Sequence, residues 1–239
     1  MSITIATLAY KEEENLRMLL PQINEYAAKL GEPYDLMVID TAKPLDNTEQ
    51  VCKENNARYI NQERPGLGGA FATAVKYATG DKVLIMDSDG SHNPKHIPEM
   101  HKLFTDEKAD VCIGSRYVKG GVNDDSKTSI LMSKFLNSVF RICLGIKAKD
   151  ISTNFRIYDA KQLKAIDIVL PNYDFLEEVL FKLQQNNPKL KIVESPIYFG
   201  KRYAGESKRR LLPFIIGYGR TLFWLTGLRI KGWFCKKGK

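Results

Sequence analysis

The sequence has few features of metal-cluster, disulfide-stabilised or secreted proteins. Its four cysteines (Cys52, Cys112, Cys143 and Cys235) lie far apart and match neither a CxxC pair nor zinc-ligand spacing, which favours reduced thiols in a cytosol-facing protein. The segment Met1–Ile5 has no basic stretch followed by a long apolar run, so we expect no signal peptide. There is also no internal repeat and no low-complexity segment.

The common phosphate-binding signatures are missing too. The loop Pro65-Gly66-Leu67-Gly68-Gly69 is not followed by Gly-Lys-Ser/Thr, so it is not a P-loop, and it does not match GxGxxG. A glycine-rich turn before a helix can still bring backbone amides close to a phosphate or a ribose. A tight loop-to-helix connection explains the same glycines equally well.

Acidic residues are nearly missing from one end of the chain. Residues 201–239 hold eleven basic residues and one acid, Glu206, and so carry +10; residues 1–200 therefore carry −2 of the total of +8. A near-neutral body with a basic, apolar end indicates contact with an anionic surface. A nucleic-acid-binding module is the other class that such charge suggests, but the interleaved aromatic and basic residues of RRM or OB surfaces are missing, so we expect no nucleic-acid partner.

Apolar runs alternate with helical patterns along the chain, and the 239 residues, 44% hydrophobic, suffice for one domain and an appendage. We predict strands at 2–8, Tyr34–Asp40, 57–61, Lys82–Asp87, Asp110–Ser115, Phe155–Tyr158 and Lys191–Ile197. We predict helices at 12–30, between the second and third strands, at 69–79, after Pro94, at 128–145 and at 174–187. This order predicts an α/β fold with a Rossmann-like, mixed but mainly parallel sheet flanked by helices.

The clearest site signal follows the strand Lys82–Asp87, the most apolar in the chain. Asp87-Ser88-Asp89 places two carboxylates one residue apart at a strand-to-loop turn, where both can approach one Mg²⁺ or Mn²⁺. Such a cation neutralises a diphosphate leaving group. Asp40 and Arg116 also follow strand ends, where ligands of parallel sheets bind. An acidic pair at a solvated turn is the ordinary alternative.

Cations near strand ends or in a glycine-rich loop are candidates for binding phosphate. They are Arg116, Arg156, Arg202 and Lys208. Each of them alone is equally compatible with a solvated surface charge. His92 is a candidate metal ligand, although a histidine that packs at a helix start is the commoner case.

Six motifs in order resemble the family-2 glycosyltransferases of GT-A fold, and most closely the dolichol- or polyprenol-phosphate mannose synthases. They span about residues 3–210. They are Tyr10–Leu16, similar to YNExENL; Gly66-Leu67-Gly68 with Ala70, similar to GLGxA; Asp87-Ser88-Asp89 with His92 and Pro94, similar to DADxxHxP; Gly114–Tyr117, which matches GSRY; Asp150 with Thr153–Arg156, similar to D-x-TSGFR; and Arg202 with Gly205–Lys208, which matches RxxGESK.

The resemblance implies an inverting, metal-dependent hexosyltransferase with Asp87 and Asp89 on the cation. It implies Asp89, Arg116, Arg202 and Lys208 as the catalytic set. It implies a nucleotide-sugar site formed by Leu8, Tyr10, Glu12, Asp40, Gly68, Asp87, Ser88, Asp89, Arg202 and Lys208. It implies an acceptor-phosphate site formed by Arg116, Ser133, Lys134 and Asn137. GDP-mannose is the favoured donor and UDP-glucose the next.

The sequence departs from these motifs at several positions. The loop after Asp40 is one residue longer and lacks a second Asp, which bears on recognition of the base or ribose. Ser91 stands where a Gln often supports the metal, Asn154 stands in place of a Gly, and Lys134 stands in place of an Arg. We therefore expect the scaffold to be kept, whereas these departures do not support the family's usual donor specificity.

The class of acceptor decides whether a general base is needed. A polyprenyl or dolichyl monophosphate is already ionised at neutral pH and needs none. The alternative is a soluble family-2 transferase that uses a sugar hydroxyl in surface polysaccharide synthesis, which needs a carboxylate base. Glu177 and Glu178 are the candidates for that base. A solvated helix face is the competing interpretation of that pair.

The apolar C-terminal run favours the lipid acceptor. Leu211–Leu228 is interrupted by Pro213, Gly217, Gly219 and Arg220, and a charge in mid-membrane costs about 2.5–3.5 kcal/mol. We therefore divide the chain into a catalytic domain at 1–210 and a basic, apolar interfacial segment at 211–239. A helix packed on the domain is the alternative. We expect a peripheral protein at the cytoplasmic face of an anionic membrane. A small membrane-protein partner is compatible with that location.

Overall fold

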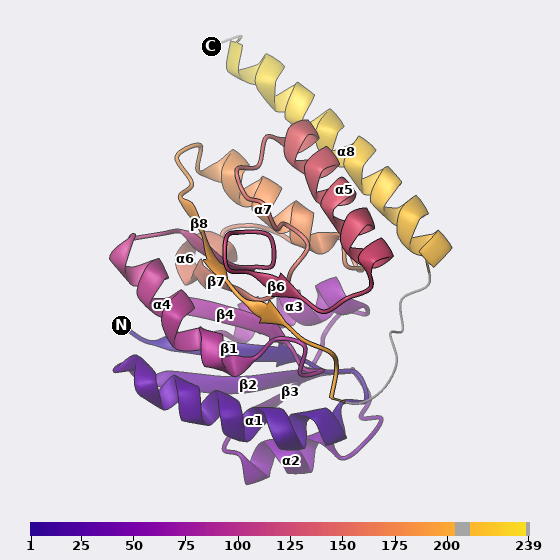
Figure 1. Cartoon of the computed structure of the whole chain (residues 1–239). Coiled ribbons are helices and arrows are strands. Elements are labelled where there is room, and N and C mark those ends of the chain that lie inside the picture. The colour runs from indigo at the N-terminus through magenta and orange to yellow at the C-terminus, as the bar shows by residue number, and fades with distance from the viewer. Residues whose placement is uncertain (204–210, 238–239) are drawn as a thin grey trace.

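A seven-stranded sheet forms the centre of the molecule. The computed structural model describes residues 1–203 and 211–237, with side chains in the last helix described for 217–230 (Figure 1). The strand order is β3-β2-β1-β4-β7-β5-β8. The strands are β1 (Ile3–Leu8), β2 (Tyr34–Asp40), β3 (Arg58–Asn61), β4 (Lys82–Asp87), β5 (Val111–Ser115), β7 (Arg156–Asp159) and β8 (Ile192–Pro196).

Strand β7 is antiparallel to both of its neighbours, β4 and β5, whereas the other adjacent strands of this sheet pair in parallel. The α/β prediction with a mainly parallel sheet is confirmed. Strand β4, predicted to be central from its apolar run, is the fourth of the seven.

Helices cover the two faces of the sheet. They are α1 (Glu13–Ala27), α2 (Thr48–Glu54), α3 (Leu67–Tyr77), α4 (Ile97–Asp106), α5 (Lys127–Leu144), α6 (Ala160–Lys164), α7 (Phe175–Asn186) and α8 (Leu211–Lys237), with short 3₁₀ turns at Ala28–Leu30 and Pro94–His96. The sequence did not predict α6, nor the two-residue strands β6 (Val122–Asn123) and β9 (Tyr198–Phe199), which pair in parallel.

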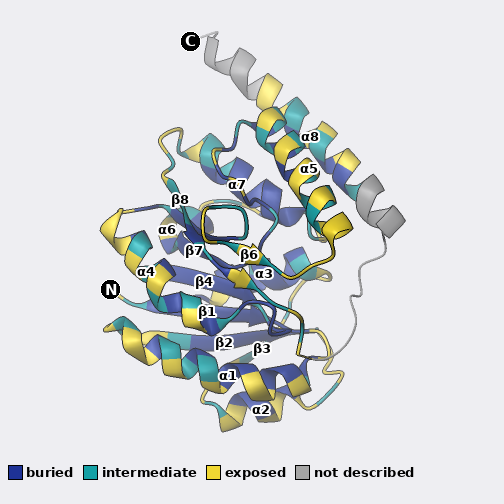
Figure 2. Cartoon of the chain, viewed as in Figure 1, coloured by how far each residue is buried: buried dark blue, intermediate teal, exposed yellow. Residues whose placement is uncertain are grey.

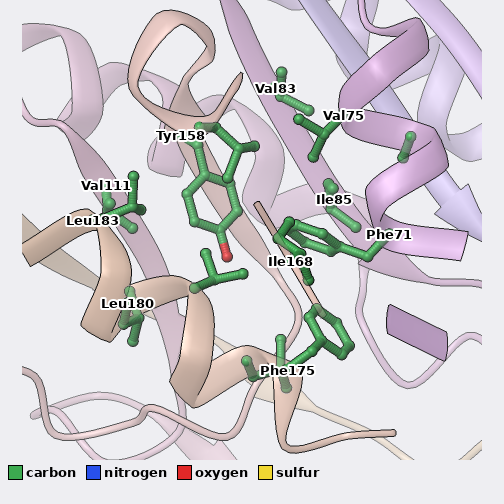
Figure 3. Packing of buried hydrophobic residues seen from close by; sticks show 14 of the residues in the cluster. Phe71, Val75, Val83, Ile85, Val111, Tyr158, Ile168, Phe175, Leu180 and Leu183 are labelled. Carbon is green, nitrogen blue, oxygen red and sulfur yellow. The ribbon is translucent and has the colours of Figure 1, made fainter. Parts of the chain in front are cut away.

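Alternating side chains of each strand enter two separate cores, because successive residues of a strand point to opposite faces. In β4, Val83 and Ile85 join α3, α5, α6 and α7 on one face. Leu84 and Met86 join α1, α2 and α4 on the other. Figure 3 shows the first core, where the rings of Phe71 and Phe175 lie 4.7 Å apart. Packing on both faces holds β4 and its neighbours in place, and the site residues follow the carboxyl ends of these strands.

The described part of α8 packs against α5 and the start of α7. The Tyr218 ring lies edge-on to Phe140 of α5 at 5.6 Å. The Thr221 hydroxyl donates a hydrogen bond to Asp174, and Leu225 is fully buried. Arg229 donates to the carbonyl of Ile142 at 3.2 Å, near the C-terminus of α5, where a cation complements the helix dipole. Figure 1 shows α5 and α8 side by side.

None of the helices among the described residues has the length and apolar character needed to cross a bilayer. The described cysteines Cys52, Cys112 and Cys143 are free thiols. Burial raises the pKa of both Cys52 and Cys112 to about 12, which keeps these two thiols protonated at neutral pH.

Candidate active site

The ends of three adjacent strands meet at one edge of the sheet. Leu8 of β1 pairs with Asp87 of β4 on one side and with Ile39 of β2 on the other, so Asp40 lies one residue past the same line. The Ser88 hydroxyl donates to the Leu8 carbonyl at 2.8 Å, which ties the loop after β4 to β1. Predicted nucleotide-site residues from three separate segments therefore lie together.

Asp87 is held by a side chain and by its own amide. Its Oδ1 accepts a hydrogen bond from Asn154 Nδ2 at 3.0 Å, and its N–H donates to His92 Nδ1 at 3.0 Å. The Asp87 side chain keeps 34% of its surface exposed. The carboxylate therefore remains open to a ligand while its orientation is fixed.

His92 supports this loop from the interior. The ring is 1% exposed and stacks on Phe155 at 5.1 Å, and burial lowers its pKa, so the imidazole is neutral. Because Nδ1 accepts from Asp87, the proton lies on Nε2, which contacts Thr153 Oγ1 at 3.3 Å. Both ring nitrogens are thus used within the protein, and the metal-ligand interpretation of His92 is wrong.

Asp89 contacts residues 202–203, which lie more than a hundred residues later in the chain. Its Oδ1 accepts from the Ser91 hydroxyl at 2.6 Å and from the Ser91 amide at 3.0 Å. Its Oδ2 lies 3.2 Å from Arg202 Nε. The Tyr203 amide donates to the Asp89 carbonyl at 2.9 Å. The structure therefore brings Arg202 to the acidic pair, as the sequence predicted.

The acidic pair fits a partly hydrated divalent cation. In residues 1–203 and the described part of α8, no three or more His, Cys, Asp or Glu side chains form a metal-binding group. Mg²⁺ is usually held by one or two protein carboxylates and completes its shell with water and substrate phosphate. The donor set of Asp87 and Asp89 suits that mode, and beside it Asn154 Oδ1 is a buried acceptor without a hydrogen bond in the described structure.

The predicted acceptor-phosphate residues form a second polar cluster around Ser152. Arg116 Nη2 donates to Ser152 Oγ at 2.8 Å, and Ser133 Oγ lies 3.2 Å from the same oxygen. Asn137 Nδ2 donates to it at 3.3 Å. Lys134 Nζ lies 5.4 Å from the centre of the Tyr117 ring, over which Arg116 also lies. Arg116, Ser133 and Asn137 are therefore brought together, with Lys134 next to them.

Asp150 holds this cluster, a role that the sequence did not reveal. Its Oδ2 accepts from Arg116 Nε and its Oδ1 from Arg116 Nη2, each at 2.8 Å. Burial opposes the charged guanidinium, but the hydrogen bonds and charge of Asp150 outweigh it and raise the Arg116 pKa. The motif that contains Asp150 marked this residue in the sequence. Its pairing with Arg116, 34 residues away, could not be predicted from the sequence.

The residues predicted to surround the nucleotide differ in exposure. Tyr10 is 52% exposed, whereas Glu12 is 9% exposed and accepts from Asn15 Nδ2. Asp40 is buried and accepts from the Tyr59 hydroxyl at 2.9 Å, and burial raises its pKa. In the altered loop that follows, Asp46 accepts from the Glu13 amide at 3.0 Å, at the start of α1.

Gly68 packs closely against the backbone of a later loop. Its N–H donates to the Pro171 carbonyl at 3.0 Å. A Cβ on Gly68 would lie 1.9 Å from the Leu170 carbonyl oxygen, and one on Gly66, where φ is +84°, would lie 2.4 Å from that of Pro171. The backbone at 170–171 therefore takes both the Gly68 amide and the space of any side chain there, and the contact of Gly68 with the nucleotide-sugar stays a prediction.

Glu177 and Glu178 lie in the first turn of α7 and are 1% and 0% exposed. Neither lies on a solvated helix face. The Glu178 carboxylate accepts from the amides of Val169 and Leu170 at 3.0 and 2.9 Å and from Lys182 Nζ at 2.7 Å. Glu178 therefore fixes the 169–170 loop, which is a structural reason for a buried acid there.

Two of the candidate cations do not add to the described site. Arg156 is fully buried and donates to the carbonyls of Ile151 at 2.6 Å and Leu176 at 3.1 Å, so the phosphate-binding interpretation of Arg156 is wrong. Lys208 lies outside the described residues.

The site thus combines the carboxyl edge of a mainly parallel sheet with the carboxylates of Asp87 and Asp89 and the guanidinium of Arg202. The chain belongs to glycosyl transferase family 2, whose family model matches residues 4–167.

The similar proteins agree with that family. The undecaprenyl-phosphate mannosyltransferase of Micrococcus luteus is 33% identical over 212 residues, which are 83% of this chain and 84% of that protein. The dolichol-phosphate mannosyltransferase of Pyrococcus furiosus is 32% identical over 93% of this chain, which spans 61% of that longer protein. The structure of glucosyl-3-phosphoglycerate synthase from Mycobacterium tuberculosis with Mn²⁺ and UDP has a TM-score of 0.73 at 20% identity, covering 95% of this chain and 80% of that one; this is a similarity of fold.

Proposed function

We propose that the chain transfers mannose from GDP-mannose to a polyprenyl monophosphate, with Mg²⁺ or Mn²⁺ bound by Asp87 and Asp89. The observation that carries this proposal is the similarity to a bacterial undecaprenyl-phosphate mannosyltransferase over 83% of this chain and 84% of the relative. Mannose is the sugar that this relative transfers. GDP-mannose is the donor favoured by the motif resemblance, and UDP-glucose is the second donor to test.

The geometry supports a transfer between two phosphate-bearing substrates. The first polar site, with Asp87, Asp89 and Arg202, lies past β4. The second, with Arg116, Ser133, Asn137 and Ser152, contains a guanidinium, two hydroxyls and an amide, which suit a phosphate. Arg116 uses Nε and Nη2 for Asp150 and Ser152, so its Nη1 is the end left for a substrate oxygen.

The transfer requires few proton movements. An ionised phosphate oxygen attacks the anomeric carbon from the face opposite the leaving diphosphate, which inverts the configuration. The bound cation supplies charge neutralisation to the leaving group. Arg202, held 3.2 Å from Asp89, adds a positive charge on the same side. No general base is needed, in agreement with the structural role of Glu178.

We further propose that the enzyme works at the cytoplasmic face of an anionic membrane, docked through α5 and α8. The sequences of α5 and α8 contain no Asp or Glu, and α5 carries Lys127, Lys134 and Arg141 at seven-residue spacing. Both helices carry exposed residues, drawn in yellow in Figure 2, and several of these residues are large and apolar. They are Leu131, Phe135 and Ile142 on α5, and Phe223, Trp224, Leu228 and Ile230 on α8.

This surface refines the division of the chain at residue 210. Tyr218 and Leu225 are buried against the domain, whereas Phe223 is 85% exposed. The helix α8 therefore both packs on the domain and offers an apolar side, together with α5, to the acyl boundary. The basic residues of these two helices attract anionic headgroups.

The test is a screen of donors and acceptors with the full chain and Mg²⁺ or Mn²⁺. GDP-mannose and UDP-glucose, labelled in the sugar, are each offered with a short polyprenyl phosphate or with an oligosaccharide that has free hydroxyls. We expect label in the lipid product from GDP-mannose, its loss with chelator, and its loss in Asp89→Asn. Transfer to the oligosaccharide with none to the lipid would contradict the proposal and support the polysaccharide alternative.

A further inference from the structure

The side chain of Asn154 lies against the cation-binding carboxylate of Asp87. It is 4% exposed, and its Nδ2 donates to Asp87 Oδ1 at 3.0 Å. An ionised carboxylate only accepts hydrogen bonds, so the amide nitrogen must be the atom that faces it. The orientation of the amide follows from this contact, and Oδ1 is therefore the atom on the other side.

That amide oxygen is a buried acceptor with no hydrogen bond among the described residues. Leaving such a group unpaired costs about 1–3 kcal/mol. This oxygen belongs to the same side-chain amide as the nitrogen that contacts Asp87, so it lies close to the Asp87 carboxylate. A ligand that donates a hydrogen at this place would remove the cost, and water bound to a divalent cation is such a donor.

The two carboxylates are held in the same way. Asp87 Oδ1 accepts from Asn154, and Asp89 Oδ1 accepts from the Ser91 hydroxyl and amide. In each residue, Oδ1 is turned toward the protein by a neutral donor. On Asp87, this leaves Oδ2, on a side chain that keeps 34% of its surface exposed.

We propose that Asn154 is a positioning residue for the divalent cation: Nδ2 fixes Asp87, and Oδ1 accepts a hydrogen bond from a water on the cation. This rests on the metal dependence in the proposed function and names a residue of this chain that tunes it. Outer partners that orient metal ligands contribute about 10–100-fold to metal affinity.

The loop that carries Asn154 does not depend on this side chain for its fold. Arg156 donates to the Ile151 carbonyl at 2.6 Å, and Asn137 Oδ1 accepts from the Ile151 amide at 3.0 Å. The Gly114 amide donates to the Phe155 carbonyl at 2.8 Å. Replacement of Asn154 by a small residue should therefore leave the backbone in place.

The experiment measures Mn²⁺ binding directly, by the EPR signal of free Mn²⁺, with the full chain in the presence of GDP and, in parallel, of UDP. The variants are Asn154→Gly and Asn154→Ala. The control is Asn187→Ala, which removes another amide–carboxylate hydrogen bond, to Asp110 at 3.4 Å, away from the site. Thermal unfolding shows that each variant is folded.

We expect both Asn154 variants to bind Mn²⁺ about 10-fold more weakly than the wild type, the lower end for an outer-shell partner. The control should bind as the wild type does. Equal Mn²⁺ affinity in wild type and both folded variants, or no Mn²⁺ binding by the wild type with either nucleotide, would overturn the proposal. If the wild type binds Mn²⁺ and yet transfers no sugar to polyprenyl phosphate, the proposed function fails while this inference is judged separately by the variants.

Discussion

The guanidinium of Arg116 and the carboxylate of Asp150 form a bidentate ion pair, with Nε 2.8 Å from Oδ2 and Nη2 2.8 Å from Oδ1. Their side chains are 8% and 0% exposed. Burial alone would raise the pKa of Asp150, but the hydrogen bonds and charge of Arg116 outweigh it and lower that pKa. Because both nitrogens of the planar guanidinium contact the Asp150 carboxylate, the orientation of the Arg116 side chain is fixed.

Asp150→Ala should destabilise the fold by about 3–5 kcal/mol, because it leaves the charge of Arg116 buried without its partner. The free energy of unfolding in urea measures this. The matched control is Glu49→Ala, which removes an exposed ion pair with Lys53, whose side chains are 50% and 65% exposed; it should cost under about 1 kcal/mol. Equal losses in the free energy of unfolding for the two substitutions would show that the buried Arg116–Asp150 pair stabilises the fold no more than an exposed ion pair does.

Glu178→Gln should destabilise the protein without removing a catalytic base. The carboxylate accepts from two backbone amides and from Lys182, and a neutral amide with one acceptor oxygen cannot replace it, so we expect a loss of about 2 kcal/mol. The turnover number per folded molecule should stay within about twofold of the wild type. A loss of turnover about 100-fold or more at unchanged stability would instead identify Glu178 as a general base.

The sequence predicted the sheet well because long apolar runs identify buried strands whatever their neighbours are. Lys82–Asp87 and Tyr34–Asp40 were predicted with their observed bounds. Strands β6 and β9 are two residues long and are defined by pairing with each other across the chain, so no local periodicity marks them.

At the site, sequence predicts residue types and strand ends, whereas partners depend on contacts across the chain. Asp87 and Asp89 were found from their place after β4. The close approach of the backbone at 170–171, which requires a glycine at position 68, could not be predicted because it lies about a hundred residues away. The hydrogen bond from Asn154 to Asp87 joins residues 67 apart in the chain and could not be predicted from motif spacing.

Acidification below pH 6.5 should destabilise the fold through His96. Its Nε2 accepts from the Tyr198 amide at 3.0 Å, and burial lowers its pKa from 6.5 to about 4. The unfolded chain binds a proton at a higher pH than the folded chain, so the stability that neutral His96 contributes is present above pH 6.5 and is lost as the pH falls toward 4. Allowing for the partial exposure of the ring, we expect about 1 kcal/mol between pH 7 and pH 5.

Urea unfolding at several pH values measures this slope. His96→Gln, which keeps a neutral side-chain acceptor, should flatten the part of the profile that His96 contributes. Buried His92, whose pKa is also lowered, adds a slope of the same sign that the variant retains. An identical slope in wild type and His96→Gln would show that His96 titrates alike in both states.

Exposed phenylalanines on α5 and α8 should contribute to membrane binding. Phe135 is 65% exposed and Phe223 is 85% exposed, so Phe135→Glu combined with Phe223→Glu should leave the free energy of unfolding nearly unchanged. The double variant loses apolar area that would enter the acyl boundary and adds two charges that anionic headgroups repel. We expect at least about 10-fold weaker binding to anionic vesicles, since 1.4 kcal/mol corresponds to tenfold.

Flotation with phosphatidylglycerol vesicles and with phosphatidylcholine vesicles measures the binding. Met18→Glu, which changes a 47% exposed apolar residue on α1, is the matched control and should float like the wild type. Transfer to a short, water-soluble polyprenyl phosphate should be unaffected in the double variant, since neither residue belongs to the two polar clusters. Unchanged flotation of the double variant would show that this face does not dock on the membrane, because both substitutions lie among the exposed apolar residues of α5 and α8 that the proposal docks.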